Sequence, residues 1–324
     1  MPIVPYSASN FGPHWGAALT GSHDLTLTWN EIVWAAMTMG KPGVAFLLSH
    51  GWHSISDLVV RSHTVYANLR ETPNYNIAKS SLYAGLDPTE KSGVSYFMGM
   101  VAAKVLGARL LGTPWLFHVS LVHALGGSVV LKAKSEPDLV GLRHDGKWIV
   151  AEAKGRTWGY SASAMAAAKL QTRQLRTING QYPSLRVAIQ ASFNPRLHWA
   201  IEDPEEYDED APDLRFNLQS AINSYYSAPL IATGKRQSRV IGNRKFLVQE
   251  LSEIGVTIGI DQDLRESLIS RNVFRNEQMR FPNQGPEPHQ HGDFIIFSDG
   301  LAISLDERWS EDRMAQDPWS RRNG

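Results

Sequence analysis

The stretch from Ser135 to Gly155 reads S-E-P-D-L-V-G-L-R-H-D-G-K-W-I-V-A-E-A-K-G. Its two apolar runs flank a His-Asp-Gly turn, a pattern that predicts antiparallel strands at 138–143 and 147–153. A Pro-Asp pair precedes the first strand, and Glu-Ala-Lys ends the second. The second strand is apolar on both faces, as in a central strand. Charged residues at the end of such a strand indicate pairing or ligand binding.

Two turns between these strands are compatible with the sequence. A two-residue Asp-Gly turn would pair His144 with Lys147. A three-residue loop, with Gly146 in the left-handed conformation, would instead pair Arg143 with Lys147. The two registers differ by one residue, and a shift of one residue moves every side chain to the opposite face of the sheet.

The register decides where the acids lie. In the two-residue register Asp138 faces Ala153, and Glu152 points to the other side. In the three-residue register Asp138 lies directly across from Glu152, with Cβ atoms about 4.5–5.5 Å apart. Two carboxylates at that distance suit one hard divalent cation, and Lys154 would share their face.

The flanking sequence alternates between helical and strand patterns. A helix is predicted after Pro88, with Thr89 as its cap and Gly112 at its end. Short apolar runs follow at 115–123 and 128–133. Serine and alanine spacing predicts a helix over 161–178, stopped by Asn179-Gly180, and 185–192 predicts a strand. The order over residues 88–195 is therefore helix, about three strands, helix, strand.

This pattern resembles the PD-(D/E)XK nuclease superfamily, which has the restriction-endonuclease-like fold. The resemblance rests on Pro137-Asp138, on Glu152-Ala153-Lys154 at the end of the next strand, and on a following helix that carries Gln. It covers residues 88–195. It implies an α/β core with a mixed sheet of about four strands flanked by helices.

The resemblance also implies roles for the site residues. Asp138, Glu152 and the backbone carbonyl of Ala153 would bind Mg²⁺ or Mn²⁺. Lys154 would orient or activate the attacking water and stabilise charge on the phosphate. A carboxylate-held metal supplies the nucleophile and counter-charge that phosphodiester hydrolysis needs. Because a Lys beside two acids is normally charged, charge stabilisation is favoured over general-base work.

Two further members of the site are predicted from the helices. Family members often have a metal-binding Glu on the first core helix, and Glu90 is the candidate. Glu136 is an alternative, and Glu90 is equally explained as an ordinary acid at a helix N-terminus. On the second helix Gln171 is expected on the buried face, where it either joins the catalytic group or is a satisfied core amide.

Charge is unevenly distributed along a chain whose net charge is zero. Residues 202–213, termed here the acidic segment, hold eight acids and no base, so the remainder carries +8. The segment is either a solvated linker or an arm that covers a basic groove until substrate displaces it. Predicted nucleic-acid-binding residues are Lys169, Arg173, Arg176, Lys235, Arg236, Arg239, Arg244 and Lys245, with Arg271, Arg275 and Arg280 beside them. For the first three, a solvated helix face explains the pattern equally well.

Composition and missing motifs exclude several other classes. The chain lacks cysteine, which excludes disulfides and thiolate chemistry and fits a cytoplasmic protein. Neither a signal peptide nor an uninterrupted apolar span is visible, so no membrane association is expected. Phosphate-loop, dinucleotide-binding and hydrolase-elbow motifs are missing as well. A zinc site formed by His289, His291 and Asp293 is a third hypothesis.

Four regions are expected: a helical N-terminal region (1–80, with a helix near Trp29–Met39), the nuclease core (81–200), the acidic loop (201–214) and a C-terminal α+β region (215–324) that ends in a hairpin. The expected function is Mg²⁺-dependent hydrolysis of nucleic acid, most of all double-stranded DNA, in prokaryotic restriction, defence or repair. The alternative is a non-catalytic nucleic-acid-binding or assembly module on the same fold. A homodimer and an activating protein partner stay open.

Overall fold

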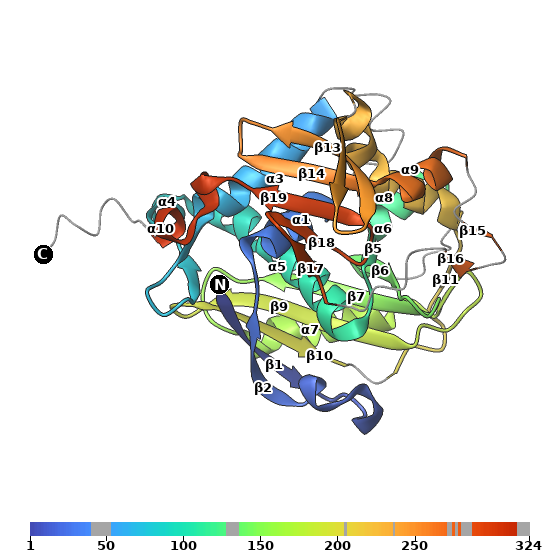
Figure 1. Cartoon of the computed structure of the whole chain (residues 1–324). Helices are drawn as coiled ribbons and strands as arrows, with labels where there is room; N and C mark the ends of the chain where they lie inside the picture. The colour runs from blue at the N-terminus through green and yellow to red at the C-terminus, as the bar shows by residue number, and fades with distance from the viewer. Residues whose placement is uncertain are drawn as a thin grey trace, which may run out of the picture.

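Two β-sheets lie on either side of a layer of helices (Figure 1). The computed structural model describes residues 1–39, 53–127, 136–203, 206–235, 237–270, 274–275, 278–279 and 287–315. Within these residues the fold is mixed α/β. The larger sheet has the order β2 (Gly21–Thr26), β1 (Ile3–Ser9), β10 (Leu197–Glu202), β9 (Leu185–Phe193), β7 (Trp148–Gly155), β6 (Leu139–Leu142), β5 (Trp115–His118).

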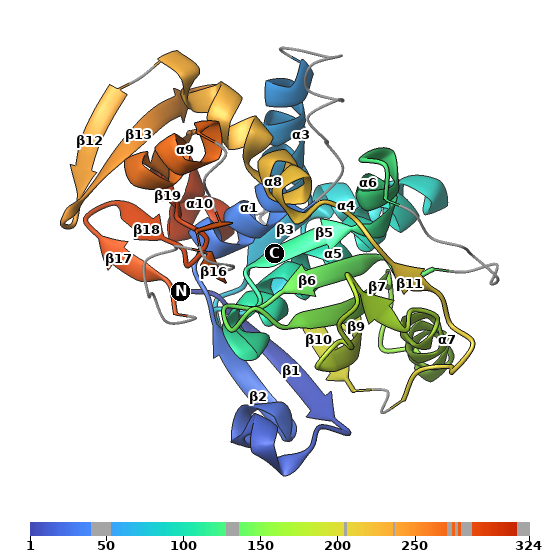
Figure 2. The same ribbon diagram turned by 90° about the vertical axis from the view of Figure 1, so that its right-hand side faces the viewer.

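The smaller sheet belongs to the C-terminal part of the chain (Figure 2). Its order is β12 (Gln237–Ile241), β13 (Arg244–Leu251), β14 (Val256–Asp261), β19 (Leu301–Leu305), β18 (Phe294–Ile296), β17 (His289–His291). Short strand pairs are formed by β3 (Leu69–Glu71) with β4 (Ile77–Lys79), β8 (Thr177–Ile178) with β11 (Asp213–Leu214), and β15 (Phe274–Arg275) with β16 (Gln278–Met279). The expected C-terminal hairpin is confirmed as β18–β19.

The helices connect and cover these sheets. They are α1 (Trp29–Thr38), α3 (His53–Asn68), α4 (Ser81–Gly85), α5 (Pro88–Leu111), α6 (Val119–Ala124), α7 (Ala162–Arg173), α8 (Leu218–Ala232), α9 (Gln262–Ile269) and α10 (Glu311–Ala315). Short 3-10 turns lie at Pro13–Trp15, Ala17–Leu19, Thr233–Lys235 and Glu307–Trp309. The α1 helix confirms the prediction near Trp29–Met39, whereas the expected strand residues 119–123 are helical and 128–133 lie outside the described residues.

The large sheet is mixed, and β7 lies near its centre. Strands β5, β6 and β7 pair antiparallel, whereas β7 and β9 pair parallel, with α7 in the connection between them. On β9, Ala188 packs with Met165 and Ala168 of α7, while its neighbour Val187 belongs to the core that includes α5. Because successive strand residues face opposite sides, α5 and α7 cover opposite faces of the sheet.

The N-terminal region differs from the all-helical expectation. Strand β1 pairs in parallel with β10, and β2 pairs antiparallel with β1. Together with β10, residues 1–26 therefore extend the large sheet to seven strands instead of about four. Short-range patterns cannot reveal this pairing, because β1 and β10 are far apart in the sequence and meet only in the folded chain.

Helix α5 begins earlier than predicted and packs close to the sheet. Asp87, not Thr89, is its N-cap, because Pro88 suits the first helical position and Glu90 completes a capping box. Gly112 ends the helix in the left-handed conformation, as expected. Among the described residues α5 is the one helix long and apolar enough to cross a membrane. Its most apolar window is 72% buried inside the fold, which accounts for that composition.

Helix α7 ends at Arg173, five residues before the predicted end. After it, the chain enters β8, which pairs in parallel with β11 at the end of the acidic segment. Arg176 and Thr177 both donate hydrogen bonds to Asp213. These contacts and the β-branched side chains after Arg176 favour an extended backbone over a further helical turn.

A buried polar cluster joins α5 to the C-terminal sheet. The ammonium group of Lys104, fully buried on α5, donates hydrogen bonds to Tyr225 of α8 and to a backbone carbonyl. Tyr225 in turn donates to Asp299 (2.5 Å), which also accepts a hydrogen bond from Trp34 (2.9 Å). Burial lowers the pKa of Lys104 to about 7. Because each polar group has a partner, the cluster connects the layers without an uncompensated charge.

The contact between α5 and the end of β7 predicts a stability difference. A Cβ on Gly155 would lie against the backbone of Ser95 and 2.7 Å from the Tyr96 nitrogen, so Gly155→Ala is expected to cost about 3 kcal/mol or more. The control is Gly93→Ala on α5, where a Cβ meets nothing within 4 Å and helix propensity should add about 0.5–1 kcal/mol. Urea unfolding measures both, and equal stabilities would contradict this packing.

Candidate active site

The hairpin formed by β6 and β7 uses the three-residue register. Leu139 pairs with Ala151 and Leu142 with Trp148. The Arg143 N–H donates to the Lys147 carbonyl (2.9 Å). Gly146 is left-handed, with φ of 78°. One position beyond the strand, this register sets Asp138 opposite Glu152.

The two acids are held by backbone groups as well as by register. The Asp138 N–H donates to Glu152 Oε2 (2.7 Å), and the Ala153 N–H donates to Asp138 Oδ2 (3.2 Å). Glu152 is 1% exposed. Burial, followed by the charge of Asp138, raises the pKa of Glu152 to about 7, although Lys154 acts in the opposite direction. The site therefore has a carboxyl group that retains a proton near neutral pH.

Lys154 and Gln171 complete a four-residue cluster. The Lys154 ammonium group donates to Glu152 Oε1 and to Gln171 Oε1, the latter at 2.6 Å. Gln171 comes from α7, which crosses the same face of the sheet. All four residues expected in the catalytic group therefore lie together at one end of β7, and Gln171 is partnered by Lys154.

The cluster has the chemistry of a hard-cation site. Its two carboxylates provide oxygen donors, and burial together with the charge of Asp138 raises the pKa of Glu152, so a divalent cation beside the pair would favour the ionised form. The described residues contain no group of three or more His, Cys, Asp or Glu side chains placed to hold a metal ion. The Ala153 carbonyl stays a predicted ligand, and water and substrate oxygens would fill the other positions of Mg²⁺.

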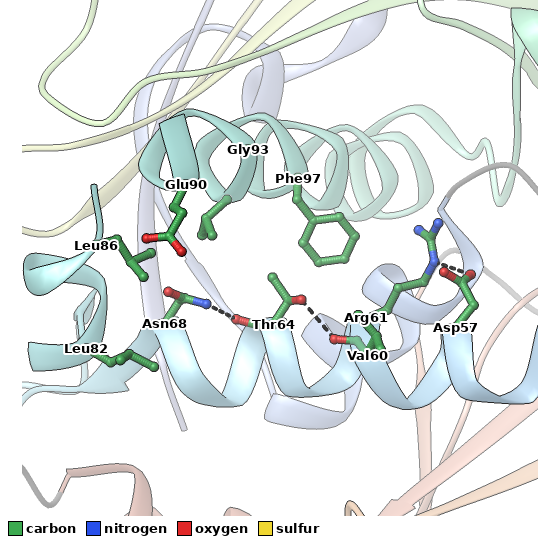
Figure 3. Close-up of a pocket in the computed structure, with 11 residues that line it drawn as sticks. Asp57, Val60, Arg61, Thr64, Asn68, Leu82, Leu86, Glu90, Gly93 and Phe97 are labelled. Atoms are coloured by element: carbon green, nitrogen blue, oxygen red, sulfur yellow. Dashed lines mark hydrogen bonds and ion pairs between the residues drawn. The ribbon is translucent and has the colours of Figure 1, made fainter. Parts of the chain in front are cut away.

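Glu90 lies in different surroundings. It accepts the Asp87 N–H (3.1 Å) at the start of α5. It also lines a cavity of about 510 Å³ between α3 and α5, where it points toward Asn68 (Figure 3). Among the described contacts, none joins Glu90 to the carboxylate pair. The alternative acid, Glu136, pairs with His123 (2.8 Å).

The three cations of α7 and its C-terminal extension all pair with the acidic segment, whose residues 204 and 205 lie outside the described residues. Lys169 contacts Glu202 at 3.4 Å. Arg173 contacts Asp208 at 3.1 Å, and Arg176 contacts Asp213 at 2.8 Å. The pairings favour the hypothesis that the acidic segment covers a basic surface over that of a solvated linker.

Tyrosine packing adds to these ion pairs. Tyr207 of the acidic segment packs against Tyr182, with ring centroids 5.5 Å apart. The guanidinium of Arg186 lies 4.8 Å from the Tyr207 ring. Gln174, just after α7, donates to Asp208. The acidic segment therefore packs on α7 and on the residues that follow it through both polar and aromatic contacts.

The C-terminal cations lie elsewhere. Arg244 pairs with Asp261 (2.7 Å), Arg239 lies over the Phe294 ring, and Lys245 is exposed. The Lys235 side chain, Arg236, Arg271, Arg280 and the Arg275 side chain lie outside the described residues. In both views β13 is at the top of the molecule, and α7 is in its lower half (Figures 1 and 2). Strand β13, which carries the described Arg244 and Lys245, therefore lies away from α7.

The alternative histidine site is not assembled. His289 and His291 lie on β17, at the edge of the smaller sheet, and both are exposed. Asp293 is exposed in the turn that follows. In the part of the chain that the structure describes, these residues do not form a three-ligand group. The hypothesis of a zinc centre at this position is therefore not supported.

Several neighbours of the site escaped the sequence analysis. Tyr96 of α5 is hydrogen-bonded to His118 at the end of β5 (3.2 Å). Lys79 lies over the exposed ring of Trp158, 4.1 Å from its centroid, in the loop after β7. Neither pair has a sequence signal, since their members are 22 and 79 positions apart. The one signal in the sequence is that Trp158 lies four residues after Lys154, which places it near the end of β7.

The raised pKa of Glu152 predicts a pH dependence of stability. The unfolded chain releases this proton near pH 4.5, whereas the folded chain retains it to about pH 7. In metal-free buffer the free energy of unfolding should therefore lose a contribution on the order of 3 kcal/mol as the pH rises through this window. Glu152→Gln should remove that loss, as measured by urea unfolding at pH 5 and pH 8 with EDTA.

The control for this measurement is Glu253→Gln, which neutralises an exposed acid in a turn of the smaller sheet. It should keep the wild-type pH dependence. If Glu152→Gln also keeps the wild-type pH dependence, then burial and Asp138 do not raise the pKa of Glu152 in the folded protein.

Comparison with known proteins assigns this chain to no family. No family model, no curated protein and no solved structure matches it. Any function must therefore be inferred from the residues and their geometry.

Proposed function

We propose that the chain is a metal-dependent nuclease of the PD-(D/E)XK kind that hydrolyses phosphodiester bonds, with double-stranded DNA as its main substrate. The observation that carries the proposal is the cluster of Asp138, Glu152, Lys154 and Gln171 at the end of β7. A structural hairpin gains nothing from two facing acids, one of which is buried and hard to ionise.

The order of elements supports the same proposal. Helix α5 is followed by β5, the short helix α6, β6 and β7, then by the crossover helix α7, the short strand β8 and the parallel strand β9. Apart from α6 and β8, this order agrees with the helix, three strands, helix, strand order that the resemblance to the restriction-endonuclease-like core implies. The acids lie on adjacent strands, and the lysine follows on the same face. Strands β1, β2 and β10 would then be additions to that core.

The residues divide the chemistry between them. Asp138 and Glu152 would hold Mg²⁺ or Mn²⁺, with the Ala153 carbonyl as a further ligand. When bound, the cation would lower the pKa of a coordinated water and offset charge on the phosphate. Lys154 contributes a positive charge beside the reacting phosphate, and Gln171 orients its ammonium group. The lysine would act by its charge, because its ammonium group is held by two oxygen acceptors, Glu152 Oε1 and Gln171 Oε1.

The acidic segment adds a condition for substrate binding. Its carboxylates occupy the cations that a phosphate backbone would contact along α7. These ion pairs are partly exposed, and such pairs contribute little to stability. A nucleic acid that releases counterions on binding can therefore replace them. In this proposal the segment competes with substrate and weakens binding to short or weakly charged ligands.

The main test is cleavage of supercoiled and linear DNA, with single-stranded RNA beside them, in Mg²⁺, Mn²⁺ and EDTA. Wild-type protein should cut DNA only with metal. Asp138→Asn and Lys154→Met should each lower the rate about 100-fold or more, because each removes a group that stabilises the transition state. Asp145→Asn and Lys147→Met at the opposite end of the same hairpin are the controls, and both should retain activity.

The possible outcomes separate the hypotheses. Cleavage lost in the two site variants and kept in the two controls supports the nuclease. Folded wild type that binds DNA without cutting it, and shows no Mn²⁺ binding dependent on Asp138, would favour the non-catalytic binding module. Mn²⁺ binding that requires Asp138, but no cleavage, would point to a missing activator or to a dimer that needs a particular substrate.

Displacement of the acidic segment predicts a change in DNA affinity. The double variant Glu202→Gln with Asp208→Asn removes two carboxylates that pair with Lys169 and Arg173. Its affinity for a DNA duplex at low salt should rise about 3- to 10-fold, and the gain should shrink at high salt. The matched control is Glu209→Gln with Asp210→Asn, exposed acids of the same segment. If DNA affinity rose equally in both double variants, the increase would be explained by net charge alone and not by the lost ion pairs.

A further inference from the structure

Tyr96 lies across the end of the strands that carry the carboxylates. Its backbone is on α5 against Gly155, the last residue of β7, where a Cβ would lie 2.7 Å from the Tyr96 nitrogen. Its hydroxyl oxygen is 3.2 Å from His118 Nε2 at the end of β5. Strand β6 lies between β7 and β5. The side chain therefore passes over the start of β6, which Asp138 precedes.

Electrostatics agrees with this position. Burial, then the negative charges of Asp138 and Glu152, raise the pKa of Tyr96 to about 12. The phenol is thus within the field of both carboxylates and keeps its proton at neutral pH. Tyr96 is nevertheless 45% exposed, so a ligand can reach this residue from solvent. By contrast, the adjacent Ser95 is buried and hydrogen-bonded to Tyr83 (2.8 Å).

The hydrogen bonds of His118 orient the hydroxyl group. The Ser120 N–H donates to His118 Nδ1 (3.2 Å), and the Ser120 hydroxyl is 2.7 Å from the same nitrogen. A backbone N–H can only donate, so this network assigns the ring hydrogen to Nε2. Nε2 then donates to the Tyr96 oxygen. The hydroxyl hydrogen of Tyr96 is left for another acceptor.

We propose that Tyr96 donates this hydrogen to a non-bridging oxygen of the phosphate that is cleaved, and that His118 is the positioning residue that turns the phenol toward it. The inference rests on the proposed nuclease function, and it adds a phosphate contact that comes from α5. Lys154 reaches the cluster from β7 on the side covered by α7. Tyr96 approaches from α5, which covers the other face, so the two donors would hold a phosphate from two sides of the strand ends.

The contact involves no transfer of a proton or of electrons. A hydrogen bond from a neutral hydroxyl group to a phosphate oxygen becomes stronger as negative charge develops on that oxygen in the transition state. Its loss should therefore lower kcat more than it raises KM. A purely structural Tyr96–His118 bridge would instead change stability and leave turnover unaffected.

The test compares Tyr96→Phe, which removes only the hydroxyl group, with Tyr75→Phe on an exposed tyrosine between β3 and β4. In DNA cleavage with Mn²⁺, Tyr96→Phe should lower kcat about 10- to 100-fold with little change in Tm. Tyr75→Phe should match the wild type. His118→Ala should lower kcat as well, whereas His118→Gln, whose amide N–H can replace Nε2–H, should recover part of it.

A binding measurement keeps this inference separate from the proposed function. Titration of a nucleoside monophosphate in the presence of Mn²⁺ reports the phosphate contact without any turnover. Tyr96→Phe should weaken this binding about tenfold, and Mn²⁺ affinity alone should not change.

If wild type cuts no nucleic acid and binds no Mn²⁺ through Asp138, but Tyr96→Phe still weakens binding of the monophosphate, the nuclease proposal fails and the phosphate contact stands. Equal monophosphate affinity and equal kcat in wild type and Tyr96→Phe would overturn the contact, whatever the cleavage result.

Discussion

Two carboxylates on facing strand positions are the constraint around which this chain is organised. The left-handed Gly146 fixes a three-residue turn, and that turn sets the register that places Asp138 across from Glu152. Burial on a central strand then prevents Glu152 from ionising freely. A shift of one residue would separate the acids onto opposite faces, so the turn, the register and the electrostatics of the site form one causal sequence.

Packing of the surrounding helices holds the two carboxylates, Asp138 and Glu152, in place. Helix α5 can approach β7 closely only because Gly155 and Gly99 lack a Cβ where the helix backbone meets the strand backbone. Helix α7 supplies Gln171, which holds the Lys154 ammonium group beside Glu152. Farther away, Lys104 and Asp299 connect α5 to α8 and the smaller sheet. Helices α5 and α7, packed on opposite faces of the large sheet, thus hold the strand ends that carry Asp138, Glu152 and Lys154. The site is therefore positioned before any ligand binds.

The elements between α5 and β9 could largely be predicted from local sequence, whereas the strands that extend the large sheet, β1, β2 and β10, could not. Turn chemistry and binary patterning predicted β6, β7, β9 and most of α7, because each depends on neighbouring residues. The early end of α7 depends on Asp213, which is 37 positions from Arg176. Likewise, β1 joins the sheet through β10, and Tyr96 meets His118 only across three strands. Such contacts are formed by topology, which one sequence does not display. The cap of α5 shows a simpler error, since Pro88 at the first helical position already pointed to Asp87.

The acidic segment links the charge pattern of the sequence to the site. A chain with net charge zero would have weak attraction for nucleic acid, yet three of its eight clustered acids, Glu202, Asp208 and Asp213, pair with the cations of α7 and its extension. In the proposed function, this internal pairing would screen those cations from weak anions and would yield to a ligand with many phosphates, because counterion release grows with the number of contacts. Selectivity for long polyanions can therefore arise without any base-specific contact. In such an arrangement, only ligands with a high charge density would displace the acidic segment and reach the carboxylate pair.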